Sequence, residues 1–492
     1  MRKIIFLFCV VYLCGCSPII PNKNTTLPGE QTASPSYGGT LKIHSYNFDT
    51  FNPLFTKSDT NRQVLMLIYD FLIICDNSML PQAELASDFS VSDDGLCWTI
   101  NIRQGVKWND GTDFTPQDVA ATLEAVKNSP HNSPYKENLL NVISIQALPD
   151  SVVITLAAPE ANFINRLEIP ILKADECQNI NIQTPIGTGC YQLTERTHRV
   201  IYLISNPSGR YTPYIETVEV HLLPDKSTSI YAFDAKETDV VKTDMLSRGQ
   251  FSGYSQRKAV EYNSALYNFL AFNTDNKYLS DINIRRAIAH TIDKKRILEE
   301  VLLSCGVISD TFLHPKWYYY NDNVPKYEHN AALAADILSQ NNIGTADITL
   351  KIMVNEDNPI KVSVAEQIAQ SIKSIGINTS VQQVSWENFR ALVADGAYDM
   401  YLGEINYSND INPKYVVPNT QTFLSLMEQL QIQTTQNGKQ AVYHQLQQQY
   451  ATDLPAVPLY FNWEAILLSD KVKGEITPLR NDIFYNIHQW YI

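Results

Sequence analysis

The sequence carries little charge and has no block of basic residues. Only 18% of its 492 residues are Asp, Glu, Lys or Arg, and the formal net charge is −14. Removing Arg2 and Lys3 with an N-terminal leader changes that charge from −14 to −16. Nucleic acids and anionic lipid surfaces attract proteins through clusters of Lys and Arg. The composition therefore makes nucleic acid and anionic lipid poor candidates as partners.

Motifs of catalysis and of nucleotide binding are also missing. The chain has no GxxxxGK[ST], GxGxxG, HExxH or GxSxG pattern, and its nine His lack metal-ligand spacing. Carboxylate pairs such as Asp93-Asp94 stand in turn sequences, where solvated turn residues are the ordinary interpretation. We therefore expect no catalytic residue, no metal site and no cofactor, although a triad assembled by folding leaves no motif.

Cysteine patterns that mark a disulfide framework or a zinc site are absent. Three of the eight Cys lie in the first sixteen residues. The other five form no CxxC motif: Cys75, Cys97, Cys177, Cys190 and Cys305. We expect buried free thiols for most of them, and a single Cys177–Cys190 bridge stays open.

The first sixteen residues, MRKIIFLFCVVYLCGC, have the pattern of a targeting signal. Two basic residues precede the apolar run 4–13, which is about half as long as a membrane-spanning helix, and no other apolar run is long enough to span. The four residues LCGC resemble the lipobox of bacterial lipoproteins, in which the last Cys, here Cys16, is lipidated. An ordinary secretory signal cut elsewhere is the alternative.

This resemblance implies a signal peptide over residues 1–15 and a lipidated tether over residues 16–37. The tether is polar and contains four Pro, a composition typical of disorder. The protein is therefore expected on the extracytoplasmic face of a bacterial cell membrane, which is the periplasmic space where an outer membrane exists.

Beyond the tether, apolar periodicity and turn residues predict strands and helices mixed along the chain. A chain of this length exceeds one ordinary core, so two or three domains are expected. Thr115-Pro116 begins a helix that Asp118 helps to cap. The other predicted helices span 282–303 and 362–375, with Gly376 ending the second. Predicted strands include 40–47, a hairpin over 89–102, 151–156, 217–223, 377–381 and 397–402.

Residues 81–126 read PQAELASDFSVSDDGLCWTINIRQGVKWNDGTDFTPQDVAATLEAV. They contain a Ser-x-Asp-Gly turn, a strand ending in Arg-x-Gly, an Asp-Gly-Thr turn and a capped helix. In this order and spacing they resemble the extracellular solute-binding proteins of family 5, the dipeptide, oligopeptide and nickel receptors of ABC importers. The resemblance runs from about residue 38 to the C-terminus. Further matching stretches are 185–193, 268–297, 375–389 with 396–404, and 453–461.

The resemblance implies an α/β, bilobal periplasmic-binding-protein-like fold of type II with an extra inserted domain. The implied lobe I comprises residues 38–57, 184–263 and 466–492, the inserted domain comprises 58–183, and lobe II comprises 264–465. The chain is expected to cross the hinge twice, near 264–270 and 460–466, and the lobes are expected to close on ligand.

The function implied is that of a lipid-anchored receptor, not an enzyme, which binds short peptides and delivers them to an ABC permease. Strand edges recognise the shared peptide backbone, and aromatic, water-filled pockets accept varied side chains. A nickel chelate, an oligosaccharide or a signalling peptide is the alternative solute. An extracellular hydrolase and a structural lipoprotein or chaperone are alternatives of other classes. A monomer is expected.

Candidate ligand-binding residues lie at strand ends and in one loop. Tyr46 and Asn47 end the first strand, where the family's cleft begins; a plain strand end is the alternative. Tyr267 lies at the hinge, where it walls the cleft or simply packs. Trp386 matches a cleft-facing Trp of oligopeptide receptors. The loop after strand 397–402 supplies four further candidates: Glu404, Asn406, Tyr407 and Asp410.

The same loop raises a question about charge. Peptide receptors of this family commonly hold the ligand's α-ammonium with an Asp in this loop, but residues 403–410 read GEINYSND. Asn406 or Tyr407 stands at the matching position. Because burying an ammonium without a carboxylate is costly, we expect Glu404 or Asp410 to supply the charge. A ligand without a free α-ammonium is the alternative.

Overall fold

The computed structural model describes residues 35–244 and 258–492. The predicted signal peptide, Cys16 and residues 16–34 of the predicted tether lie outside the described residues. Within these two described ranges, no helix combines the length and the apolar character that crossing a membrane requires.

The strand predicted after Gly39 is present and belongs to a four-stranded sheet of order β1-β10-β9-β8. Leu41 and Ile43 alternate with more exposed residues along β1, so one face of the strand packs into a core. β1 runs parallel to β10, and β8, β9 and β10 are antiparallel neighbours. The bounds are β1 (Thr40–Tyr46), β8 (Tyr191–Arg196), β9 (Val200–Ser205) and β10 (Thr217–Leu223).

Residues 58–183 contribute a second four-stranded sheet, of order β4-β5-β7-β6, and the predicted hairpin over 89–102 is confirmed. The helix predicted at Thr115-Pro116 is also confirmed: the backbone N–H of Thr115 donates to Asp118 Oδ2 at 2.9 Å in a capping box. The strands are β2 (Ile73–Cys75), β3 (Pro81–Ala83), β4 (Ala86–Val91), β5 (Cys97–Ile102), β6 (Val142–Ala147) and β7 (Ser151–Leu156). The helices are α1 (Asp59–Leu65), α2 (Pro116–Asn128) and α3 (Phe163–Arg166).

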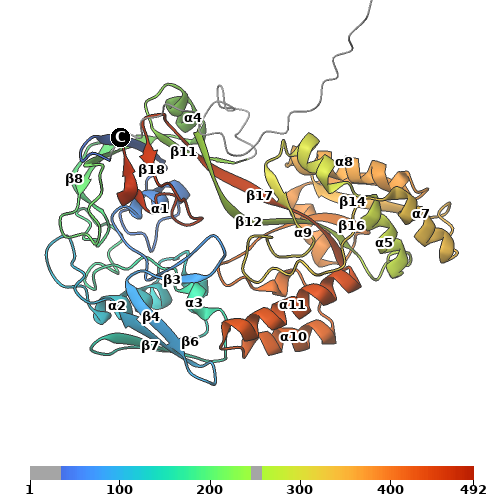
Figure 1. Cartoon of the computed structure of the whole chain (residues 1–492), viewed down its shortest axis with the longest axis horizontal. Helices are drawn as coiled ribbons and strands as arrows, with labels where there is room; N and C mark the ends of the chain where they lie inside the picture. The colour runs from blue at the N-terminus through green and yellow to red at the C-terminus, as the bar shows by residue number, and fades with distance from the viewer. Residues whose placement is uncertain (1–34, 245–257) are drawn as a thin grey trace, which may run out of the picture. The chain divides into compact units, whose positions relative to one another are not determined.

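A seven-stranded sheet has the order β11-β17-β12-β16-β14-β15, with β13 paired to β17. Its strands are β11 (Val240–Asp244), β12 (Lys258–Phe272), β13 (Gly306–Ile308), β14 (Thr349–Asn355), β15 (Asn378–Val384), β16 (Met400–Asn406) and β17 (Ala456–Leu468). The two longest, β12 and β17, run antiparallel through the middle of the molecule (Figure 1). β14 is parallel to both β15 and β16.

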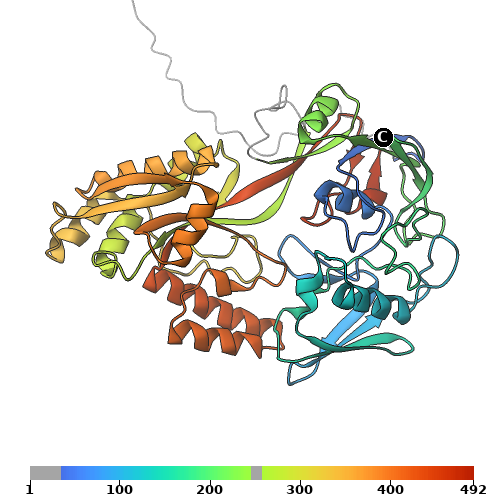
Figure 2. The ribbon, with the colours of Figure 1, turned by 180° about the vertical axis from the view of Figure 1, so that it is seen from behind.

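Helices pack along this sheet and beside one another. α8 packs on β14 and β15, and α5 packs against α7. α10 and α11 lie side by side, next to the segment that carries α3, in both views (Figures 1 and 2). The remaining bounds are α4 (Lys226–Asp234), α5 (Ile282–Thr291), α6 (Lys294–Arg296), α7 (Ala331–Gln340), α8 (Pro359–Lys373), α9 (Trp386–Ala394), α10 (Gln421–Gln431) and α11 (Gln436–Asp453), with β18 (Lys473–Gly474) and β19 (Trp490–Tyr491).

The long strands β12 and β17 stay paired across the first predicted hinge crossing, but the strands beside them change. Residues 258–262 of β12 pair with the part of β17 that also pairs with β11, whereas residues 266–272 of β12 pair with β16 and residues 267–271 still pair with β17. The register between β12 and β17 shifts between Asn263 and Tyr267. On one side of this shift Tyr262 joins the core cluster of β1 and β10, and on the other Tyr267 joins an aromatic core with Phe461. The division into two lobes and an inserted domain stays our prediction, and this shift is the feature that supports it.

The predicted helix over 282–303 is wrong in its length. α5 ends at Thr291, Ile292 has extended backbone, and the Asp293 side chain accepts from the Arg296 N–H to begin the short α6. A π-helical turn follows over Ile297–Val301. The apolar spacing continues through the break, and Asp293 competes with the helix by capping a new one.

The structure joins no two of the five cysteines in the described ranges by a disulfide, so the Cys177–Cys190 bridge does not form. Cys177 is buried beside Thr122, whose hydroxyl lies 3.4 Å from the sulfur. Burial raises the pKa of the Cys177 thiol to about 12, so it remains protonated at neutral pH.

Candidate functional site

Three parallel strands bring distant segments to one edge of the large sheet. β14 ends at Asn355, β15 ends just before Ser385, and β16 ends at Asn406. Each of the first two is followed by a helix with a capped start: Asn358 accepts from the Lys361 N–H, and Ser385 accepts from the Asn388 N–H. The carboxyl ends of parallel strands are where open α/β sheets bind ligands. A ligand site is therefore expected at this edge of the sheet.

A pocket of about 600 Å³ lies at this edge. Aromatic rings form most of one wall: Trp386 stacks on Phe389 at 5.7 Å and 13°, and Phe389 meets the edge of Tyr401 at 5.8 Å. Tyr401 in turn meets Phe269 at 6.1 Å. The volume of the pocket is within the range of about 300–1,000 Å³ for small-molecule sites. Its other lining residues are Asn355, Asn358, Lys361, Arg390, Val393, Ala394, Leu402, Gly403, Glu404, Ile405 and Tyr415.

Gly403 keeps this aromatic wall in place. A Cβ atom at this position would come closer than van der Waals contact to the rings of Phe269 and Tyr401. The backbone of Gly403 is fixed from behind by pairing with Phe269 on β12. Only a residue without a side chain therefore fits beneath these two rings.

A second, smaller pocket of about 190 Å³ adjoins the first, because both are lined by Asn358, Lys361 and Glu404. Together we call these two pockets the groove. Lys361 Nζ lies 3.2 Å from Glu404 Oε2, and the two side chains are 13% and 31% exposed. Burial lowers the pKa of Lys361 while Glu404 opposes that change. The small pocket is otherwise lined by Asp244, Ser264, Leu266, Asn268, Ile360, Tyr460, Asn462, Trp463 and Glu464.

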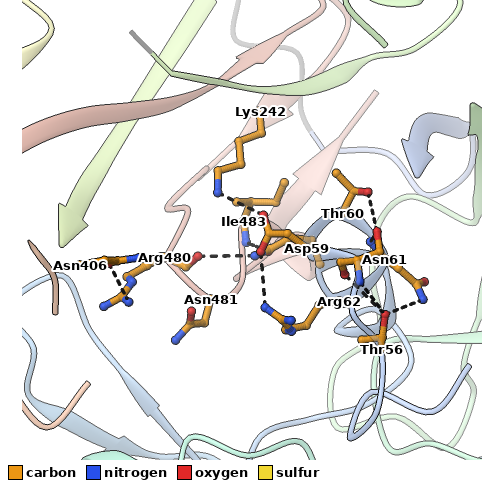
Figure 3. Close-up of polar contacts among 12 residues, drawn as sticks. Thr56, Asp59, Thr60, Asn61, Arg62, Lys242, Asn406, Arg480, Asn481 and Ile483 are labelled. Carbon is orange, nitrogen blue, oxygen red and sulfur yellow. Dashed lines mark hydrogen bonds and ion pairs between the residues drawn. The ribbon is translucent and has the colours of Figure 1, made fainter. Parts of the chain in front are cut away.

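A charged cluster borders the small pocket (Figure 3). Lys242 Nζ lies 3.7 Å from Glu464 Oε1 and 3.4 Å from Asp59 Oδ2, and Asp59 also pairs with Arg62 at 3.6 Å. The half-buried Tyr46 faces this cluster, and burial raises the pKa of its phenol. Charges from β11, β17 and α1 therefore converge beside the groove.

Asn406 is joined to the C-terminal segment. Arg480 Nη2 donates to Asn406 Oδ1 at 3.3 Å, and Figure 3 shows the two side chains end to end. Burial lowers the pKa of Arg480, while the nearby Glu168 opposes that change. Asn406, one of the two residues that the resemblance places at the position of the family's Asp, thus accepts from a guanidinium of the same chain.

The structure brings some predicted site residues together and separates others. Trp386 and Glu404 line the groove, Tyr46 and Asn406 lie at the charged cluster or next to it, and Asn47 is an exposed residue with φ of 56°. Their contact with a ligand stays a prediction.

Tyr267 and Tyr407 lie in the core rather than on a wall. Tyr267 is fully buried and stacks on Phe269 at 5.2 Å. Tyr407 is 2% exposed and meets the edge of Trp317 at 5.4 Å. Side chains alternate along a strand and its continuation, so Tyr407 turns inward where Asn406 turns outward.

Asp410 is also buried, and its carboxylate already has partners. It accepts from Arg166 Nη2 at 2.7 Å and from the Ser408 hydroxyl, and its own backbone carbonyl accepts from Asn162 Nδ2 at 2.9 Å. Arg166 also pairs with Glu160. The side chain of Asp410 thus joins the loop after β16 to α3 and its flanks, away from the groove.

Sequence reasoning missed Lys361, Phe389, Lys242 and Arg480. Lys361 follows the Asn358-Pro359 helix start directly after β14, a strand that the sequence analysis did not predict, so recognising that strand and helix would have placed Lys361 at the carboxyl edge of the sheet. Nothing local marks Arg480, because it lies 74 residues from Asn406. In the part of the chain that the structure describes, no group of three His, Cys, Asp or Glu side chains is placed to hold a metal ion.

Comparison with known proteins gives consistent matches over most of the chain. The family described as "Bacterial extracellular solute-binding proteins, family 5 Middle" matches residues 81–423. Oligopeptide-binding protein AppA of Bacillus subtilis is 23% identical over 540 residues, which cover 100% of this chain and 98% of that protein. Heme-binding protein A of Haemophilus influenzae is 24% identical over 460 residues, covering 82% of this chain and 83% of that protein.

Among solved structures, the ABC transporter substrate binding protein CtaP of Listeria monocytogenes has a TM-score of 0.77 to this chain at 19% identity. The match covers 93% of this chain and 100% of that chain. The fold is therefore the mixed α/β periplasmic-binding-protein fold.

Proposed function

This chain belongs to the bacterial extracellular solute-binding proteins of family 5, and we propose that the solute it binds is a short peptide held in the groove. The protein is a solute-binding receptor of an ABC importer and not an enzyme. That the solute is a peptide is our proposal, and an ABC permease is the partner to which the receptor would deliver it.

One observation carries the peptide proposal. Among the described residues, β14 pairs with β16 at Met400 and Tyr401 and no further along. The next residues of β16, from Gly403 to Ile405, line the groove. Their backbone groups on that side are therefore offered to an extended chain, which is the way a strand edge recognises a peptide backbone of any sequence.

The charges in the groove suit a zwitterion. Glu404 lines both pockets, and its side chain is 31% exposed, whereas that of Asp410 is 3% exposed and paired to Arg166. Of the two carboxylates expected to supply the charge, Glu404 is the one we propose for the ligand's α-ammonium. Lys361 would then exchange Glu404 for a carbonyl or carboxylate of the peptide.

Calorimetry on one binding tripeptide and its N-acetylated form tests this assignment. With wild type, acetylation should weaken binding by roughly a hundredfold, because a buried charge-assisted pair is lost. Glu404→Gln should remove the difference between the two peptides, and Asp410→Asn is the matched control that should preserve it. If acetylated and free peptides bind wild type equally, the α-ammonium assignment is wrong.

Titrations with other solutes distinguish a peptide receptor from a receptor for another ligand. Heme-binding protein A shows that a relative of similar identity is named for a different ligand. Titrations with haemin, a nickel–histidine chelate and an oligosaccharide therefore accompany the peptides. Peptides should raise the melting temperature and be recovered uncleaved. A rise with one of the other solutes alone would replace the peptide proposal.

We also propose that Cys16 anchors the receptor by a lipid, since the LCGC sequence precedes a polar, Pro-rich tether. A single acyl chain binds membranes only marginally, so stable anchoring needs more than one. Cys16→Ala should move the protein from the membrane fraction to the soluble extracytoplasmic fraction. Unchanged retention in the membrane fraction would refute the anchor.

A further inference from the structure

The rim of the large pocket exposes aromatic surface that a folded protein normally covers. Trp386 is 52% exposed and Tyr415 is 68% exposed, and both line the pocket. One face of the Trp386 ring is occupied by Phe389, which it stacks on at an interplanar angle of 13°. The other face remains available. Exposed apolar surface next to a cavity of about 600 Å³ points to a ligand that covers it.

The wall behind Trp386 is built for a flat ring. Phe389 and Tyr401 meet edge to face at 86°, and Tyr401 and Phe269 do so at 68°. Gly403 has no side chain, so the rings of Phe269 and Tyr401 lie directly over its backbone. Aromatic pairs prefer offset stacking and edge-to-face contact, so these rings favour another aromatic ring over an aliphatic chain of equal volume.

Charge differs between the two pockets in a way that orients a peptide. The small pocket has three carboxylates, Asp244, Glu404 and Glu464, and one ammonium, Lys361. The large pocket has Lys361 and Arg390 against Glu404 alone. Lys226 lies 3.0 Å from Asp244 and Lys242 lies 3.7 Å from Glu464, so cations already pair with these two carboxylates. Glu404, where the two pockets join, is thus the carboxylate that a positive terminus would meet, and a negative group is favoured toward Arg390.

We infer that the groove selects short peptides whose first residue is aromatic. The α-ammonium would meet Glu404 where the two pockets join, and the side chain of the same residue would enter the large pocket against Trp386. A peptide with its aromatic residue further along would have to place either its ammonium or its ring outside the matching pocket. This inference rests on the proposed function, because it specifies which peptides the same groove takes.

Calorimetry with three tripeptides of matched size tests the inference: Phe-Ala-Ala, Ala-Ala-Phe and Ala-Ala-Ala. Wild type should bind Phe-Ala-Ala roughly tenfold or more tighter than either of the others. In Trp386→Ala this preference should fall at least severalfold. Tyr231→Ala is the matched control, because Tyr231 is an exposed aromatic residue on α4 and lines neither pocket.

Each alternative outcome has a separate meaning. Equal affinity for all three tripeptides would overturn the inference and leave the peptide receptor intact. Binding of none of them, together with binding of another solute, would overturn the proposed function itself. An equal loss of affinity for all three in Trp386→Ala would assign Trp386 a structural role and overturn the inference. Circular dichroism of the variants, expected to match wild type because both residues are exposed, establishes that they are folded.

Discussion

Replacing Arg166 by Met should destabilise the protein by leaving the buried Asp410 and the partly buried Glu160 without their cation. Arg166 pairs with Asp410, whose side chain is 3% exposed, and with Glu160, whose side chain is 14% exposed. Removing one partner of a buried ion pair costs about 3–5 kcal/mol, because the remaining charge stays desolvated. Here two carboxylates remain, so we expect a loss of unfolding free energy in that range at pH 7.

The loss should shrink in acid. Burial already raises the pKa of Glu160 in the wild type, where Arg166 opposes the rise. Without Arg166, the folded-state pKa of Glu160 rises further. A group with a raised folded-state pKa contributes stability that is present below its unfolded pKa and is lost as the pH rises. The deficit of the variant should therefore be small near pH 4 and grow toward pH 7.

Urea unfolding followed by circular dichroism measures this difference, with Arg296→Met as the control. Arg296 pairs with Glu300 at 2.9 Å on an exposed helical surface, where the side chains are 64% and 52% exposed. Exposed pairs of this kind contribute about 0.3–0.5 kcal/mol. Equal losses in Arg166→Met and Arg296→Met, or a deficit of Arg166→Met that does not change with pH, would refute the reasoning.

Three further predictions follow from buried groups. Burial raises the pKa of Glu168 to about 7, although Asn481 and Arg480 oppose this rise. The stability that protonated Glu168 contributes is present below pH 4.5 and is lost by pH 7, so the urea midpoint of Glu168→Gln should rise relative to that of wild type across this window; a constant difference between the two midpoints would contradict this. Gly403→Ala should weaken peptide binding at least tenfold with little loss of melting temperature, because the added methyl group forces the rings of Phe269 and Tyr401 into the groove. An unchanged affinity would show that the peptide does not contact this aromatic wall. Thiol titration of a denatured, unreduced chain starting at residue 36 should find five thiols, and three would indicate the bridge that the structure lacks.

Local patterns were enough to predict several elements of the fold. β1, the hairpin over 89–102 and the capped start of α2 each depend on alternation, a turn sequence or a cap within a few residues. The break after Thr291 could not be predicted from periodicity, because Ile284, Ile288 and Ile292 keep helical spacing across it. There the Asp293 cap outweighs a pattern that continues.

Of the candidate site, the sequence predicted only residues that follow the ends of predicted strands. Trp386 and Glu404 follow predicted strands, and the parallel pairing of β14 with β15 and β16 brings them to one edge. Lys361 could not be paired with Glu404 from the sequence, because 43 residues separate them and strand order brings them together. The inward turn of Tyr407 and the burial of Asp410 depend on the register of the loop after β16, where a shift of one residue reverses the facing of every side chain.

The central claim is that the groove holds a short peptide. Native mass spectrometry of the protein purified from its own host without unfolding tests it most directly, in wild type and in a Glu404→Gln, Trp386→Ala double variant. The account predicts bound species with the masses of short peptides in wild type and a much lower occupancy in the double variant. A bound species that is not a peptide, or peptides retained at equal occupancy by the double variant, would contradict it.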